Sequence, residues 1–210
     1  MMPTEINRKI VISQPITDRL AGEVIDMILA INDYDAQMSA VLTSYEIEPI
    51  EMFINSGGGS ASAGFAIIGA MEMSETPIVT YGMGIIASMA LGIFTAGDVR
   101  IAHRYARFMF HSVAYGEEGF IQDHIDGLKE VKTIQNMYNN IFAERSKFPT
   151  EMITDILERK KNYFFSGKKA VKYGIADDVM KKPEPKIEMV SEDEYQKLMA
   201  ELEEEINKSK

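Results

Sequence analysis

The amino-acid sequence predicts an α/β protein whose strands are joined by helices and pair mainly in parallel. Apolar runs with strand character alternate with amphipathic or small-residue helical runs, and the order strand, turn, helix occurs three times in the first half of the chain. Such alternation is typical of parallel sheets with crossover helices. The 210 residues, 46% hydrophobic and 26% charged, suffice for one domain with a sizeable core and an appendage.

The first two units occupy the N-terminal third of the chain. Residues 8–13 form a strand, and a helix with one apolar face begins near Thr17. Residues 32–49 carry no clear period and are predicted to mix loop with short helix. Residues 50–54 form the second strand, and residues 61–73 form a helix rich in small side chains.

The third unit contains the turn on which the functional argument depends. An apolar strand at residues 77–82 leads into a turn at residues 84–90, and a run of helix formers follows. Ser88 therefore lies where a strand passes into a helix, beside amide groups that have no partner within the helix. Two further strands are predicted at residues 99–102 and 106–111.

A long helical pattern occupies residues 118–145. It has more apolar positions than one side of a small domain can bury. These side chains could pack against the protein's own core or against a partner subunit. Shorter helices are predicted at residues 149–160 and from Ser166 onward, and residues 175–180 close the sheet.

The domain is predicted to span residues 1–180 and to be followed by an acidic appendage at residues 181–210. A linker at Pro183–Pro185 precedes Ser191, where a capping-box pattern begins an amphipathic helix. This helix could dock on the domain, dock on a partner, or stand as a solvated terminal helix.

Composition excludes several classes of function. The formal net charge of −10 disfavours binding to nucleic acids, and the absence of cysteine excludes disulfides and thiol chemistry. The N-terminus shows no signal-peptide pattern, which predicts a cytoplasmic protein. Residues 76–97 carry no charge, but their glycines and polar residues favour a buried strand, turn and helix over a membrane span. Neither a metal nor a cofactor is predicted.

A glycine-rich loop, Asn55 to Ser60, follows the second strand. It lacks the third glycine of the dinucleotide fingerprint, where Ser62 stands, and it lacks the Gly-Lys-Ser/Thr of a P-loop. What remains is a loop whose backbone can approach a ligand closely and offer N–H groups to a phosphate or an oxyanion.

Ser88 and His111 are the residues that carry chemistry. A serine at the start of a helix is often only a cap. A serine beside free amides, with a histidine at the end of an adjacent strand, instead provides the nucleophile, base and oxyanion donors of acyl transfer. His103 and His124 are predicted to be solvated, and the three histidines show no metal-ligand spacing.

Four motifs in order resemble the Clp protease proteolytic subunit (ClpP) family over about residues 8–180. They are Ile54-Asn55-Ser56-Gly57-Gly58-Gly59-Ser60 with Ala63-Gly64, Gly84 with Ala87-Ser88-Met89-Ala90, Phe108-Met109-Phe110-His111, and Phe164-Phe165-Ser166 with Tyr173-Gly174-Ile175-Ala176-Asp177. The resemblance implies the repeated β-β-α spiral that this family shares with crotonase-like enzymes, with a protruding handle helix at about residues 113–146.

The resemblance also implies a serine peptidase. Ser88 would be the nucleophile, His111 the base, and the N–H groups of Gly59 and Met89 the oxyanion hole. Residues 113–119 would pair with an extended peptide substrate. Stacked heptameric rings would form a closed chamber that admits unfolded or threaded polypeptides.

Three departures from the family pattern bear on activity. Asn162 stands where the family has its third catalytic residue, an aspartate, so the imidazole lacks a charged partner and a weaker enzyme is expected. Gly57 replaces a proline and should loosen the glycine-rich loop. Only residues 1–7 precede the first strand, which argues against docking of an ATP-driven AAA+ unfoldase.

Other functions fit parts of the pattern. Crotonase-like acyl-CoA enzymes share the fold and an amide oxyanion hole but do not need Ser88 with His111. A prohead-maturation or signal-peptide-peptidase relative would cleave defined proteins. A ring subunit that has lost activity through Asn162 would assemble without forming an acyl-enzyme.

Overall fold

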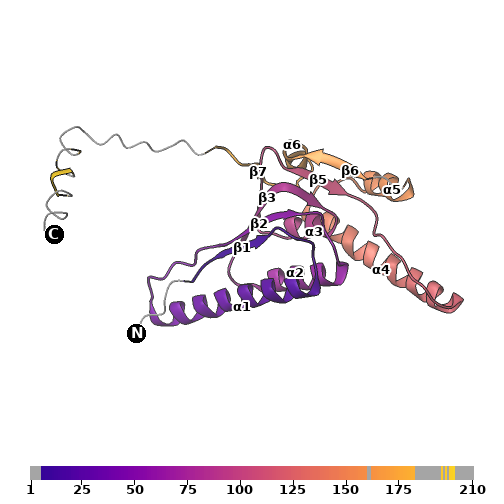
Figure 1. Cartoon of the computed structure of the whole chain (residues 1–210), viewed down its shortest axis with the longest axis horizontal. Helices are drawn as coiled ribbons and strands as arrows, with labels where there is room; N and C mark the ends of the chain where they lie inside the picture. The colour runs from indigo at the N-terminus through magenta and orange to yellow at the C-terminus, as the bar shows by residue number, and fades with distance from the viewer. Residues whose placement is uncertain (1–5, 160–161, 183–194, 196, 198, 202–210) are drawn as a thin grey trace. The chain divides into compact units, whose positions relative to one another are not determined.

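One seven-stranded sheet carries the fold, and it branches at its central strand (Figure 1). The strands are β1 (Lys9–Ile12), β2 (Ile50–Ser56), β3 (Ile78–Ala87), β4 (Val99–Ala102), β5 (Arg107–Phe110), β6 (Tyr163–Ser166) and β7 (Asp178–Val179). The path β1-β2-β3-β4-β7 is parallel throughout. A second branch runs from β3 to β5 in parallel and from β5 to β6 in antiparallel pairing.

The structure is a computed structural model that describes residues 6–159, 162–182, 195, 197 and 199–201. It divides into two units, residues 1–180 and residues 181–210. The predicted linker at residues 183–185 lies outside the described residues, as does most of the predicted C-terminal helix.

The branch arises because β3 bends halfway along its length. Its first half, Val79–Gly82, pairs with β4, and its second half, Ile85–Ala87, pairs with β5. Between the halves, Gly84 has φ +66°, and a Cβ there would lie 2.4 Å from Asn55 Oδ1. The same oxygen accepts a hydrogen bond from the Ile85 N–H at 3.0 Å. This bend carries the end of β3 toward β5.

Six helices are described. They are α1 (Asp18–Val41), α2 (Ala61–Met73), α3 (Met89–Thr95), α4 (Ile121–Arg145), α5 (Thr150–Glu158) and α6 (Gly167–Lys172). Figure 1 shows α1 and α2 side by side along β1 and β2. The strand residues that alternate toward the core are fully buried, namely Ile10, Ile12, Met52 and Ile54.

Helix α3 lies at the centre of the core, because all seven of its residues are buried. The uncharged stretch at residues 76–97 is therefore a buried strand and helix, as predicted. No helix in the described part of the chain is both long enough and apolar enough to cross a membrane.

Helix α4 extends away from the sheet (Figure 1). Only its C-terminal half contributes to the core, through Tyr138 and Phe142. The opposite end presents apolar side chains to solvent, including Ile121, which is 81% exposed, and Leu128, which is 51% exposed. The sequence leaves open whether the apolar positions of this helix pack on the protein's own core or on a partner subunit. The core buries only the C-terminal half of α4.

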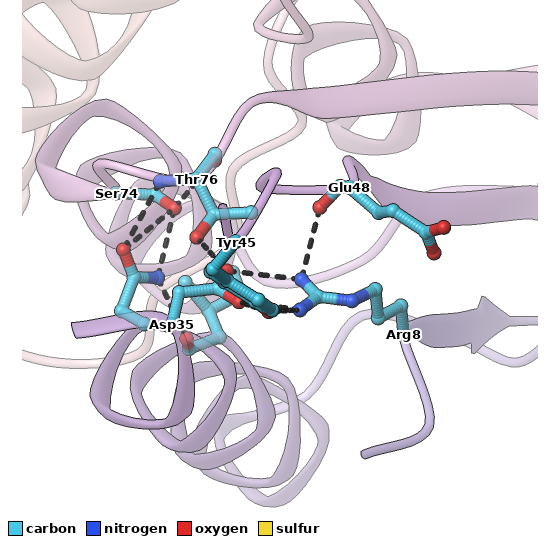
Figure 2. Close-up of polar contacts among 8 residues, drawn as sticks. Arg8, Asp35, Tyr45, Glu48, Ser74 and Thr76 are labelled. Carbon is cyan, nitrogen blue, oxygen red and sulfur yellow. Dashed lines mark hydrogen bonds and ion pairs between the residues drawn. The ribbon is translucent and has the colours of Figure 1, made fainter. Parts of the chain in front are cut away.

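A charged cluster ties β1 to α1 (Figure 2). The Arg8 guanidinium forms an ion pair with the buried carboxylate of Asp35 and donates a hydrogen bond to the Tyr45 hydroxyl at 2.7 Å. It also donates to the Glu48 carbonyl at 2.9 Å, and Thr76 donates to Asp35 at 2.6 Å. Four segments that are distant in sequence are joined by these contacts.

The structure adds detail at two places. Residues 32–49, predicted to mix loop with short helix, contain both: α1 continues through residues 32–41, where Asp35 is a buried partner in the charged cluster, and residues 42–49 form a loop. Strand β6 was not predicted, because its four residues gain their partners only from the distant β5.

Candidate active site

Ser88 lies at the sharp turn between β3 and α3 and has an unusual backbone conformation. Its φ of 54° and ψ of −132° make it the one non-glycine residue with positive φ in the described part of the chain. Such a conformation costs about 1–3 kcal/mol and occurs where surrounding contacts enforce it. The Ser88 N–H donates to the Met109 carbonyl at 3.0 Å, which anchors the turn to β5.

The glycine-rich loop packs directly against this turn. A Cβ on Gly58, whose φ is +96°, would lie 2.6 Å from the Ser88 Cβ and 2.8 Å from the Ala87 carbonyl oxygen. Gly64, in the first turn of α2, leaves room for the Met89 side chain, which would lie 2.1 Å from a Cβ there. The loop therefore reaches the turn only because these positions lack side chains.

The amides of Gly59 and Met89 border a common cavity and have no hydrogen-bond acceptor among the described residues. The flanking loop contacts use other groups: the Ile16 N–H donates to the Gly58 carbonyl, and the Ser60 N–H donates to the Ile16 carbonyl, each at 2.9 Å. Two backbone donors beside Ser88 are thus available to a ligand oxygen.

His111 follows β5, which pairs with the end of β3, and this pairing brings it to Ser88. Its Nε2 lies 2.8 Å from the Ser88 hydroxyl oxygen, within hydrogen-bond distance. The ring is half-buried, and burial lowers the pKa of His111 below its ordinary value of 6.5. At neutral pH the imidazole is therefore uncharged, as a general base must be.

Asn162 lies next to His111 in register but does not contact its ring. The β5–β6 pairs end at Phe110 opposite Tyr163, so one further step of the ladder sets His111 opposite Asn162. The hydrogen bonds of the described residues include none between the Asn162 side chain and the imidazole, and Asn162 is exposed. The expected orienting contact is absent from this conformation.

Asp177 and Asp178, two carboxylates of the C-terminal part of the domain, form no hydrogen bond with His111. Asp177 forms a bidentate pair with the Arg100 guanidinium, at 2.6 and 3.0 Å. The Asp178 carboxylate accepts a hydrogen bond from the Val179 N–H at 2.7 Å. Both side chains are thus engaged elsewhere.

A cavity of about 240 Å³ opens in front of Ser88 and His111. The rest of its wall mixes polar and apolar groups, from Gly59, Ser60, Ala61, Phe65, Met89, Val113, Ala114, Ile134 and Tyr138. Among the described residues, no group of three or more His, Cys, Asp and Glu side chains could hold a metal ion. A cavity beside a serine and two free amides suits a carbonyl substrate.

The match to known proteins agrees with this geometry. The family model described as Clp protease matches residues 4–183. The chain belongs to the Clp protease family. An ATP-dependent Clp protease proteolytic subunit from Pleurastrum terricola is 31% identical over 172 residues, which are 81% of this chain and 82% of the relative. A protein of the same name from Oenothera elata subsp. hookeri is 36% identical over 132 residues, which are 60% of this chain and 52% of the relative.

The predicted family and fold class are thereby confirmed, and the branched sheet with the protruding α4 is the Clp protease form of the α/β spiral. Two residues at the site were not singled out from sequence, Gln135 and Tyr138 of α4. Gln135 Oε1 accepts a hydrogen bond from the Val113 N–H at 2.7 Å, and Tyr138 donates to the Ser88 carbonyl at 2.8 Å. In the sequence Tyr138 is one more member of an apolar helix face, and no pattern distinguishes it.

Proposed function

We propose that this chain is a serine endopeptidase that cleaves unfolded or threaded polypeptides. The observation that carries the proposal is the 2.8 Å contact between His111 Nε2 and Ser88 Oγ at a strained turn. The pair has the geometry of nucleophile and base. Family membership supports the peptidase class.

In the proposed reaction, Ser88 Oγ attacks the peptide carbonyl carbon while His111 Nε2 takes the hydroxyl proton. The Gly59 and Met89 N–H groups hydrogen bond to the oxyanion that forms. His111 then returns the proton to the leaving amine, and an ester between Ser88 and the new carboxyl group remains. Water, deprotonated by His111, hydrolyses this ester.

Asn162 is proposed as the orienting partner of His111 when substrate fills the site. Its amide carbonyl can accept a hydrogen bond from Nδ1–H but supplies no charge to the imidazolium. In Ser-His-Asp enzymes the change from Asp to Asn costs about 10⁴ in turnover. We therefore expect slow turnover from this chain.

Substrate is proposed to add as a strand along residues 113–119, which are exposed from Ala114 onward and belong to no strand. Stacked rings of seven copies are proposed from family membership and from the exposed apolar end of α4. Both relatives are named ATP-dependent, so an ATP-driven AAA+ unfoldase is the partner we propose for delivering folded substrates.

Incubation of the purified protein with a permanently unfolded model protein tests the proposal. New peptides, identified by mass spectrometry, should appear with the parent chain and not with Ser88→Ala. Cleavage that persists in Ser88→Ala, or none with either chain, would contradict it.

A second candidate, a ring subunit without activity, is favoured by one observation, the missing contact between Asn162 and His111. Such a subunit would assemble into rings but would release no peptides and form no acyl-enzyme.

A further inference from the structure

The Ser88 carbonyl is held by a side chain from α4, far along the sequence. The Tyr138 hydroxyl donates a hydrogen bond to this oxygen at 2.8 Å, and the Tyr138 side chain is buried at 4% exposure. The same carbonyl accepts the Leu91 N–H, also at 2.8 Å. Burial raises the pKa of Tyr138, so its hydroxyl keeps its proton and remains a donor at all working pH values.

This carbonyl shares a peptide unit with a proposed oxyanion donor. The peptide bond between Ser88 and Met89 is planar, so the direction of the Ser88 C=O fixes the opposite direction of the Met89 N–H. A contact that prevents this plane from rotating therefore also fixes the direction of the Met89 N–H, and Met89 lines the cavity. The strained backbone of Ser88 needs surrounding contacts to hold it in place.

The Tyr138 ring also contacts the strand that ends at His111. It stacks on Phe110, the residue before His111, with ring centroids 5.3 Å apart and planes inclined by 17°. On the α3 side, a Cβ on Gly92 would lie 3.3 Å from the Tyr138 ring, so glycine there gives the ring room to approach. One side chain thus contacts the Ser88 backbone and the residue that precedes His111.

We propose that Tyr138 is a positioning residue of the active site: its hydroxyl fixes the Ser88–Met89 peptide plane, and so aims the Met89 N–H at the reacting carbonyl. The inference rests on the proposed peptidase function, which it deepens. Tyr138 also lines the cavity, but the role proposed for its hydroxyl is exerted through the backbone of Ser88 and Met89.

Tyr138→Phe is the direct test, because it removes the hydroxyl and keeps the ring. An oxyanion donor acts in the transition state, so its misalignment lowers kcat and leaves KM nearly unchanged. Loss of a whole donor costs about 10²–10³ in kcat, and we expect a misaligned one to cost about tenfold. Tyr173→Phe is the matched control, since its hydroxyl bonds to Tyr163 at 2.7 Å, away from Ser88.

The measurements are kcat and KM on a fluorogenic peptide, the thermal midpoint, the assembly mass, and hydrogen exchange of the segment at residues 86–91. Tyr138→Phe should lower kcat and speed exchange in this segment, while Tyr173→Phe changes neither. Wild-type kcat and exchange in Tyr138→Phe would overturn the inference, as would an equal loss in Tyr173→Phe or a rise in KM alone. If the parent chain cleaves no peptide, the proposed function fails, and hydrogen exchange still decides whether Tyr138 holds the turn.

Discussion

At the scale of single residues, the His111 imidazole has no carboxylate partner among the described residues. Burial lowers its pKa below 6.5, and no carboxylate among the described residues counters that shift. In a Ser-His-Asp site, the carboxylate would stabilise the imidazolium and raise this pKa. Asn162 has no charge to do so, although it lies opposite His111 in register.

The pH dependence of kcat/KM follows from this difference. The base is active when neutral, so the acid limb of the parent profile should lie below pH 6.5. Asn162→Asp adds a negative charge beside the ring, which raises the pKa of His111 and moves the acid limb to higher pH. It should also raise kcat by at least about tenfold, since the reverse change costs about 10⁴ in Ser-His-Asp enzymes. A limb above pH 6.5 in the parent, or no gain in Asn162→Asp, would contradict this reading.

Alanine substitutions at two adjacent positions of the glycine-rich loop, Gly57 and Gly58, should have opposite effects on stability. Gly57 has a φ outside the left-handed region and open space where a Cβ would lie, so Gly57→Ala should stabilise the protein by about 0.4–1 kcal/mol. Gly58→Ala would force a Cβ to 2.6 Å from Ser88 and should destabilise the protein and abolish activity. Thermal unfolding with peptide hydrolysis measures both, and equal effects of the two variants would refute the loop geometry.

The sequence predicts those site residues that a local sequence pattern places, and it does not predict those placed by contacts between distant elements. The strand-to-helix turn at Ser88 has a local pattern, and parallel pairing of neighbouring units brings His111 to it. The 2.8 Å contact is therefore the one the motif order leads us to expect. The roles of Gln135 and Tyr138 depend on how α4 packs across α3, and the orientation of the Asn162 side chain depends on its surroundings, so neither follows from the sequence.

At the scale of elements, the charged cluster of Figure 2 joins β1, α1 and two loops. It also explains why the sequence pattern does not show where α1 ends within residues 32–49. Residues 32–41 look polar and aperiodic, yet Asp35 is buried at 3% exposure because Arg8, Tyr45 and Thr76 satisfy its oxygens. A buried carboxylate with distant partners breaks the apolar pattern by which a helix is recognised.

Asp35 should stabilise the fold strongly at neutral pH. Asp35→Asn leaves the Arg8 guanidinium without its counter-charge and should cost about 3 kcal/mol of unfolding free energy. Asp26→Asn, an exposed change on the same helix, should cost little. Denaturant unfolding at pH 7 compares them, and similar losses would show that the ion pair does not stabilise β1.

The lowered pKa of Asp35 also predicts how the stability of the fold changes at acidic pH. Burial favours the protonated carboxyl, but hydrogen bonds from Arg8, Thr76 and Tyr45 and the charge of Arg8 outweigh it, so the pKa of Asp35 is lowered to about 2 from its ordinary value of 3.8. Its stabilisation is fully present above about pH 4 and is lost as pH falls from 4 toward 2. The parent should therefore lose more stability than Asp35→Asn over this interval.

At the scale of the whole molecule, α4 joins the surface proposed for assembly to the candidate active site. Its N-terminal end exposes apolar side chains, whereas its C-terminal half carries Gln135 and Tyr138 to the active site. A copy that covers the exposed end would therefore act on the same helix that holds the Ser88 turn. This arrangement suits an enzyme that is active only when assembled.

Charged residues on this end should prevent assembly. Ile125→Glu combined with Leu128→Lys places charges at positions that are 44% and 51% exposed, so the single subunit should still fold. The particle mass in solution should fall, and peptide hydrolysis should fall with it. Lys132→Glu, an exposed change one turn further on, is the control and should assemble normally. Unchanged mass in the double variant would show that other surfaces hold the assembly.

Ser88 is proposed to be an activated nucleophile although His111 lacks an aspartate partner. Incubation with a fluorophosphonate, followed by intact mass, tests it most directly, because the reagent captures an activated serine without needing a substrate. We predict one adduct per chain on the parent and none on Ser88→Ala. No adduct on folded, assembled parent protein, or an adduct that persists in Ser88→Ala, would contradict the account.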